Sequence, residues 1–149
     1  MARTPPAQIW GIASTEYGVL IFDKGNNTIG GSLGGNTIAF NGAAGISIGA
    51  GGFVGNQGNL IESNSIYSNV GLGIDLGDNG PDFPQDVGDI SGPNKRQNFP
   101  ILTSVQAAGG RTEIRGVINN EINPAKLQLQ FFSSAAADAS GFGEGQRRS

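Results

Sequence analysis

Cysteine and histidine are both absent from this chain of 149 residues. Without cysteine the chain can form no disulfide and carries out no thiolate chemistry. Without histidine it lacks the usual general base near neutral pH and the commonest metal ligand. These absences exclude the active sites that are built on a thiolate or an imidazole.

Charge is scarce, and long apolar runs are missing. Charged residues make up 14% of the chain and the net charge is −3, with no basic cluster before Arg147 and Arg148. A nucleic-acid partner is therefore not expected, because it requires a concentrated positive surface. The first residues, MARTPPAQIWGIAS, lack an uninterrupted apolar segment behind a basic start, so we expect neither a signal peptide nor a membrane span there. We expect the chain to be a piece of a longer protein.

Glycine, in contrast, is abundant at 26 residues, and asparagine is also frequent. Both residue types tolerate the left-handed backbone conformation that tight turns require. Helical periodicity is absent from the first half, where apolar pieces of three to five residues alternate with glycine or asparagine. The composition therefore predicts short strands joined by frequent turns.

Two stretches of the sequence share one pattern of asparagine, glycine and isoleucine. Residues 36–48 read NTIAFNGAAGISI and residues 64–76 read NSIYSNVGLGIDL. Each copy is too short to bury its own apolar face, whereas stacked copies bury it together. The constant offset predicts three apolar columns inside the stack: Ile38 on Ile66, Ile46 on Ile74, and Ile48 on Leu76.

Asparagines recur at the same offset. Asn36 aligns with Asn64, and Asn41 aligns with Asn69. We expect these four residues to form structural ladders at the corners, where asparagine adopts the left-handed conformation and its amide bonds to the neighbouring copy.

These patterns predict an all-β chain whose residues 1–77 form two to three coils of a parallel β-helix. The expected strands are residues 9–14, 18–22, 27–31, 36–38, 45–48, 59–61, 64–66 and 73–76. A small antiparallel β-sandwich with repetitive turns is the alternative.

The composition of the sequence changes after Leu76. Residues 78–97 are rich in aspartate, glycine and proline, which predicts a long ordered loop with no regular element. Residues 98–149 should form a partial antiparallel β-sandwich, with strands at 97–105, 112–118 and 127–132. The remainder is small and glycine-rich, so we expect a truncated module that is mobile or borrows a partner.

The phrases NTIGG, GNTIAFNGAAGISI, GNLIESNSIYSNVGLGIDLG and GPNKRQNFPILTS resemble the C-terminal coils of bacterial right-handed parallel β-helix repeat proteins. LQLQFFSSAAADASGFGEGQ resembles the start of the β-sandwich module that follows the helix in that family. The resemblance covers residues 25–146. It implies a right-handed helix and a secreted or cell-surface parent protein. The family often has a cysteine near Ala136 and Ala137, which this chain lacks.

The acidic loop is the main candidate for a metal site. Six oxygen-bearing residues fall close together in a glycine- and proline-rich frame: Asp75, Asp78, Asn79, Asp82, Asp86 and Asp89. Ca²⁺ prefers such carboxylate and amide oxygens on a chain that can fold around it. The alternative is that these residues form Asx turns and bind nothing.

Two function classes remain open. The first is a structural or adhesive module that associates with itself through open coil ends or contacts polysaccharide through Tyr17 and Tyr67. The second is a fragment of a polysaccharide lyase or glycoside hydrolase. A hydrolase needs paired carboxylates, yet Asp75 is the one acid in the repeated strands, and its counterparts are Ser47 and Leu20. We therefore name no catalytic residue and no required cofactor.

Overall fold

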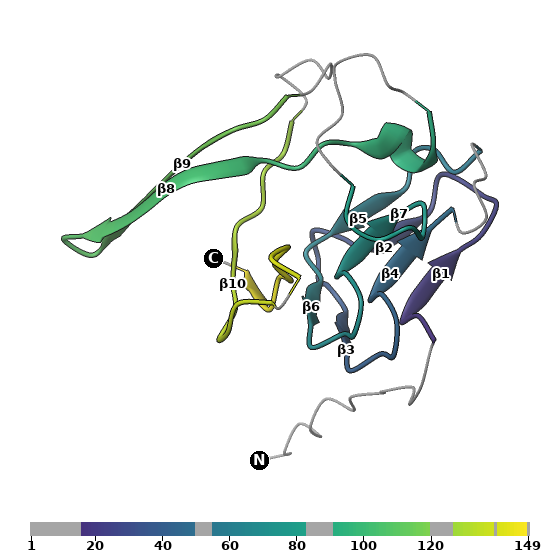
Figure 1. The fold of residues 1–149 in the computed structure, drawn as a ribbon, viewed down its shortest axis with the longest axis horizontal. Coiled ribbons are helices and arrows are strands. Elements are labelled where there is room, and N and C mark those ends of the chain that lie inside the picture. Colours follow the sequence, from purple (N-terminus) through teal and green to yellow (C-terminus); the bar gives the residue numbers. More distant parts are fainter. Residues whose placement is uncertain (1–15, 50–54, 83–90, 120–126, 139, 149) are drawn as a thin grey trace.

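The computed structural model describes residues 16–49, 55–82, 91–119, 127–138 and 140–148. Within these ranges the chain is all-β, with one short 3-10 helix. Seven strands of three residues each lie in the first half: β1 Val19–Ile21, β2 Thr28–Gly30, β3 Thr37–Ala39, β4 Ile46–Ile48, β5 Leu60–Glu62, β6 Ser65–Tyr67 and β7 Ile74–Leu76. We call β1 to β7 the strand stack (Figure 1).

All pairings within the strand stack are parallel. One sheet has the order β1-β4-β7, and two further sheets pair β2 with β5 and β3 with β6. The register confirms the predicted pairs Ile38–Ile66, Ile46–Ile74 and Ile48–Leu76, and it pairs Val19 with Ile46. The parallel direction contradicts the antiparallel sandwich considered for this region.

The apolar columns meet in one small core. Its buried members are five isoleucines, Ile21, Ile38, Ile46, Ile48 and Ile66. Ile74 pairs as predicted but remains 42% exposed, because β7 is the last strand of its sheet among the described residues. The core is therefore deepest at β4, which has a strand on each side.

Glycine permits the close spacing at one corner of the strand stack. Gly18 and Gly45 precede β1 and β4. A Cβ atom on Gly18 would lie 2.6 Å from the carbonyl oxygen of Gly45, and one on Gly45 would lie 2.8 Å from that of Gly73. Any larger residue would therefore push successive strands apart.

The second half of the chain agrees with the predicted antiparallel pairing of two strands and differs from the prediction in two places. The loop contains the 3-10 helix η1, Pro93–Arg96. Strands β8 (Ile101–Ala108) and β9 (Arg111–Val117) form an antiparallel hairpin that extends away from the strand stack (Figure 1). The third predicted strand, 127–132, does not join that hairpin. Its end forms β10, Phe132–Ser133, which pairs with β11, Arg147–Arg148.

Contacts with the strand stack explain the last difference. The Gln130 side-chain oxygen accepts a hydrogen bond from the Ser63 N–H at 3.0 Å. The Gly145 carbonyl accepts one from the Ile66 N–H at 2.9 Å. The segment therefore follows the β5–β6 side of the stack, and the tail, which we expect to be mobile or to borrow a partner, is hydrogen-bonded to β6.

No helix among the described residues is long and apolar enough to cross a membrane.

Candidate functional site: the closed end of the strand stack

The asparagines predicted to form ladders are hydrogen-bonded in pairs. The Asn69 side-chain oxygen accepts two hydrogen bonds from Asn41, one from its backbone N–H at 3.2 Å and one from its side-chain amide at 2.7 Å. Asn64 accepts the same two bonds from Asn36, at 2.9 and 3.0 Å. Each oxygen is thus held between two N–H groups of the preceding asparagine.

The left-handed conformation belongs to a different residue from the one predicted. It occurs one position before the asparagine, at Phe40, Ser63 and Ser68, with φ angles of 61°, 62° and 56°. The four ladder asparagines have no positive φ. The turn at the preceding residue directs the asparagine N–H and amide toward the same acceptor, so the asparagine type is required for hydrogen bonding and not for its backbone freedom.

A third ladder was not predicted. Asn27 donates from its side-chain amide to the Asn59 oxygen at 2.8 Å, and the Asn59 N–H donates to the Asn94 oxygen at 3.0 Å. This column is irregular in sequence, because residues 49–58 separate β4 from β5 and a long loop precedes Asn94. The signal that could have identified it is the asparagine that precedes each β-rich piece.

Two of the three asparagine columns end on a side chain that follows β7 in the chain. Asn94 of η1 closes the Asn27–Asn59 column. The Glu144 carboxylate accepts from the Asn69 side-chain amide at 2.8 Å and from its N–H at 3.3 Å, which closes the Asn41–Asn69 column. Beside it, the Ser65 hydroxyl donates to the Gln146 carbonyl at 2.5 Å. We call this surface the closed end.

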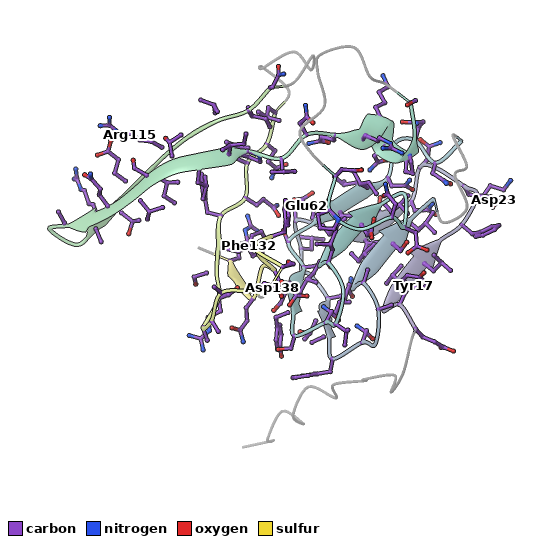
Figure 2. All side chains as sticks on the ribbon, viewed as in Figure 1. Tyr17, Asp23, Glu62, Arg115, Phe132 and Asp138 are labelled. Atoms are coloured by element: carbon purple, nitrogen blue, oxygen red, sulfur yellow. The ribbon has the colours of Figure 1, made fainter. Side chains whose placement is uncertain are left out.

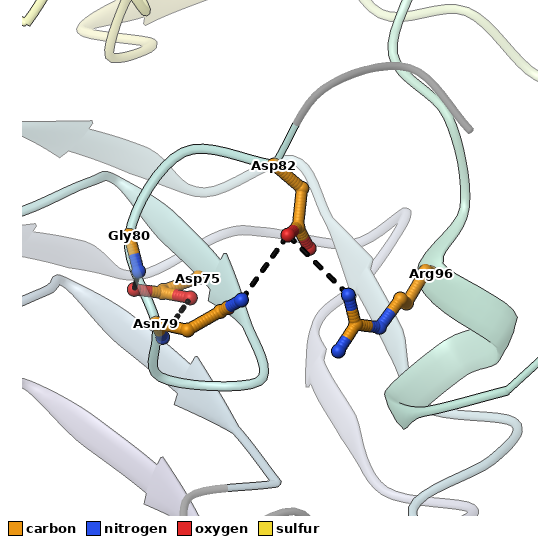
Figure 3. A network of polar contacts seen from close by, with 5 residues as sticks. All are labelled: Asp75, Asn79, Gly80, Asp82 and Arg96. Atoms are coloured by element: carbon orange, nitrogen blue, oxygen red, sulfur yellow. Dashed lines mark hydrogen bonds and ion pairs between the residues drawn. The ribbon is translucent and has the colours of Figure 1, made fainter.

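Asp75 lies in β7, the last strand of its sheet, and pairs with Ser47 of β4. Its carboxylate is buried at 6% exposure and accepts hydrogen bonds from the N–H groups of Gly80, at 3.0 Å, and Asn79, at 3.4 Å (Figure 3). Burial raises the pKa of the Asp75 carboxyl, and the two backbone N–H groups partly oppose that rise. Asp75 therefore orders the start of the acidic loop at an electrostatic cost.

Asp78 connects the acidic loop to the first strand. It accepts hydrogen bonds from the Tyr17 hydroxyl at 2.6 Å and from the Ser47 hydroxyl at 3.3 Å. The bond to Asp78 also raises the pKa of the Tyr17 hydroxyl. An open depression of about 330 Å³ lies here, with a lining that includes Tyr17, Ala44, Leu72, Asp75, Asp78 and Ser140.

The remaining residues of the predicted metal set do not converge. Asp82 accepts from the Asn79 amide at 3.2 Å and forms an ion pair with Arg96 at 3.4 Å (Figure 3). Asp86 and Asp89 lie outside the described residues. Within the described ranges no three acidic side chains are grouped as metal ligands would be. Asp75, Asp78 and Asp82 instead bind donors of the chain, and Ca²⁺ stays a prediction.

The two predicted glycan-contact residues lie in different surroundings. The Tyr17 hydroxyl is bonded to Asp78. Tyr67 is half-buried, and its ring contacts that of Phe40 edge to face, with centroids 5.6 Å apart. Phe40 is 51% exposed. It is not one of the two residues that the sequence predicted as candidates for glycan contact. The two rings form an aromatic surface on the β3–β6 side.

The raised pKa of Asp75 predicts a specific pH dependence of stability. An acid whose folded pKa lies above its ordinary value of 3.8 loses its stabilising contribution as the pH rises from that value through the folded pKa. We expect wild type to lose stability relative to Asp75→Asn as the pH rises through this window. The difference in their free energies of unfolding, measured by denaturant titration at several pH values, should follow this slope.

Asp138 provides a control, because its pKa shifts in the direction opposite to that of Asp75. The Ser140 hydroxyl and N–H lower the pKa of the Asp138 carboxyl. Its contribution is present above the ordinary value and is lost as the pH falls through the folded pKa. Wild type should therefore gain stability relative to Asp138→Asn as the pH rises. A difference between wild type and Asp75→Asn that does not vary with pH would contradict the assignment of the raised pKa.

Comparison with protein-family models, with curated proteins and with solved structures gives no match to this chain. The site must therefore be interpreted from its own geometry.

Proposed function

We propose that this chain forms the last coils of a right-handed parallel β-helix and closes its end, as a structural or adhesive module of a secreted or cell-surface protein. The observation that supports the proposal is the closed end itself. Groups from three separate segments bind residues at this end: Asn94 binds Asn59, Glu144 binds Asn69, and the Gly80 N–H binds Asp75. Stacked β-structures require such terminal caps, because an open last turn exposes unpaired strand groups.

Glu144 offers the most direct test. Replacing it with alanine removes the acceptor for two N–H groups of Asn69, a residue that is 7% exposed. We expect Glu144→Ala to lower the free energy of unfolding by about 1–2 kcal/mol. We also expect it to self-associate at concentrations where wild type does not change, because the uncapped donors and the adjoining strand edge then bind another chain. Denaturant titration and sedimentation velocity measure the two effects.

Glu62 in β5 is the matched control. It is a half-buried glutamate of the same strand stack, and the structure gives its side chain no hydrogen bond within the described ranges. Glu62→Ala should leave both the stability and the sedimentation close to those of wild type. If Glu144→Ala behaves like Glu62→Ala in both measurements, the capping role of Glu144 is wrong.

The geometry gives less support to a polysaccharide enzyme. Both oxygens of Asp78 accept hydrogen bonds, from Tyr17 and Ser47, and both oxygens of Asp75 accept backbone N–H groups. These contacts give the two carboxylates a role in ordering the loop. Contact with glycans is supported by a different feature, the exposed ring of Phe40 beside Tyr67.

A further inference from the structure

The β8–β9 hairpin carries an unpartnered apolar face. The register pairs Val105 with Ile114 and Leu102 with Gly116, so Leu102, Val105 and Ile114 lie on one face. Their exposures are 56%, 60% and 36%. No residue of either strand is buried, and Figure 2 shows Arg115 on the hairpin far from the strand stack. The hairpin therefore gains little stability from the rest of the chain.

A two-stranded hairpin is marginally stable in water, and three or more strands are needed to stabilise it. The two outer edges differ in their capacity to accept another strand. β8 has an irregularity between Leu102 and Ser104, and such bulges hinder further pairing. β9 continues without interruption from Arg111 to Val117. The edge of β9 is therefore the better template for an added strand.

The charges on the other face of β9 alternate in sign. Arg111, Glu113 and Arg115 occupy successive positions on this face. Glu113 and Arg115 already form an ion pair within the strand, with a distance of 2.6 Å and side-chain exposures of 58% and 70%. Opposite charges that face each other across two strands stabilise pairing, whereas like charges oppose it. The alternating charges of β9 therefore favour a partner strand with complementary charges, and they favour one register of pairing over its neighbours.

We propose that β9 pairs antiparallel with β9 of a second copy of this chain, with Ile114 opposite Ile114. This register places Glu113 opposite the second copy's Arg115, and by symmetry Arg115 opposite the second copy's Glu113. It uses all seven residues of β9, since Ile114 is the centre of the strand. The product is a four-stranded antiparallel sheet with a continuous apolar face. This inference goes beyond the proposed function and uses a surface distant from the closed end.

Neighbouring registers are less favourable. Centring the pair on Glu113 places Arg111 opposite Arg115 and sets Glu113 against itself, so all the charged pairs repel. Centring the pair on Thr112 forms attractive pairs between Arg111 and Glu113. It leaves Gly116 and Val117 unpaired, however, and requires the two glycines of the hairpin turn to pair as strand residues. Only the register centred on Ile114 combines full pairing with two attractive charge pairs.

Cysteine crosslinking tests this register, because the chain has no native thiol. We expect Ile114→Cys to form a disulfide-linked dimer under mild oxidation, since directly opposed residues have Cβ atoms about 5 Å apart. Val105→Cys is the control. It is more exposed than Ile114, at 60% against 36%, and lies on the same face, but two copies of β8 would lie roughly 14 Å apart across the four-stranded sheet. Val105→Cys should therefore form no disulfide-linked dimer under the same conditions.

Charge exchange provides an independent test by sedimentation equilibrium of the full chain. Glu113→Arg and Arg115→Glu each produce two like-charge pairs and should weaken dimerisation roughly tenfold or more. The double variant Glu113→Arg/Arg115→Glu restores both attractive pairs and should recover the affinity of wild type. In the register centred on Thr112 the double variant would not recover, because Arg111 would face the new arginine.

The proposal is overturned if wild type remains monomeric at all accessible concentrations. It is also overturned by a dimer that tolerates both single charge reversals, since another surface must then form it. Circular dichroism of each variant establishes that the strand content is unchanged. Because the Glu144→Ala test reports on the closed end, its outcome is independent of the outcome at β9.

Discussion

Replacing Ile46 with alanine should lower the free energy of unfolding by about 2–5 kcal/mol, the largest effect expected from a single side chain. Ile46 is fully buried at 0% exposure in β4, the central strand of its sheet. It pairs with Val19 on one side and with Ile74 on the other. The cavity would therefore open inside the core, where backbones held close by glycine cannot move together to fill it.

Leu20 is the control for this prediction. It lies in β1 of the same sheet but is 45% exposed. Leu20→Ala should cost much less, because partly exposed side chains leave no closed cavity. Chemical denaturation of the two variants measures the difference. A cost for Ile46→Ala no greater than that for Leu20→Ala would show that the isoleucine columns are not the main source of stability.

Replacing Asn69 with alanine should cost about 2–4 kcal/mol, through lost hydrogen bonds and not through lost apolar contact. Its side-chain oxygen accepts two bonds from Asn41, which is itself only 3% exposed. Its amide donates to the Ile38 carbonyl at 3.2 Å and to Glu144 at 2.8 Å. Removing the side chain leaves buried donors of Asn41 without an acceptor, and water reaches them poorly.

Two further variants separate hydrogen bonding from shape. Asn36→Ala removes an exposed donor of the neighbouring ladder, where water can replace it, and should cost less than half as much. Asn69→Asp retains the shape but places a carboxylate beside Glu144, so it should be strongly destabilising at neutral pH. The measurement is again denaturant titration. If Asn69→Asp is as stable as wild type, the amide donor contributes little.

The sequence was sufficient to predict the register of β3 with β6 and of β4 with β7. The reason is physical: a parallel pairing in which isoleucine and asparagine coincide at one offset satisfies apolar burial and amide bonding together. The left-handed residue was misassigned because asparagine has two properties, conformational tolerance and hydrogen bonding. The four predicted ladder asparagines use the second property, and Phe40 or Ser68 takes the left-handed conformation instead.

The closed end could be predicted only in part. The acidic residues after β7 were evident as a cluster, but their partners were not. Tyr17 and Asp78 are separated by most of the strand stack in sequence, and Glu144 bonds to Asn69 from near the end of the chain. Such contacts depend on how loops return to the stack, and no local periodicity encodes that path. The alternating residues 127–132 likewise favoured a strand, yet the contact of Gln130 with Ser63 directs them elsewhere.

The asparagine ladders also give the strand stack a chemical direction. Every amide pair donates forward, from Asn27 to Asn59, from Asn36 to Asn64 and from Asn41 to Asn69. Glu144 ends the Asn41–Asn69 column, because its carboxylate accepts hydrogen bonds from Asn69 and offers no N–H for a further residue. The two ends of the strand stack therefore differ chemically, because all the amides donate in one direction and one column ends on a carboxylate.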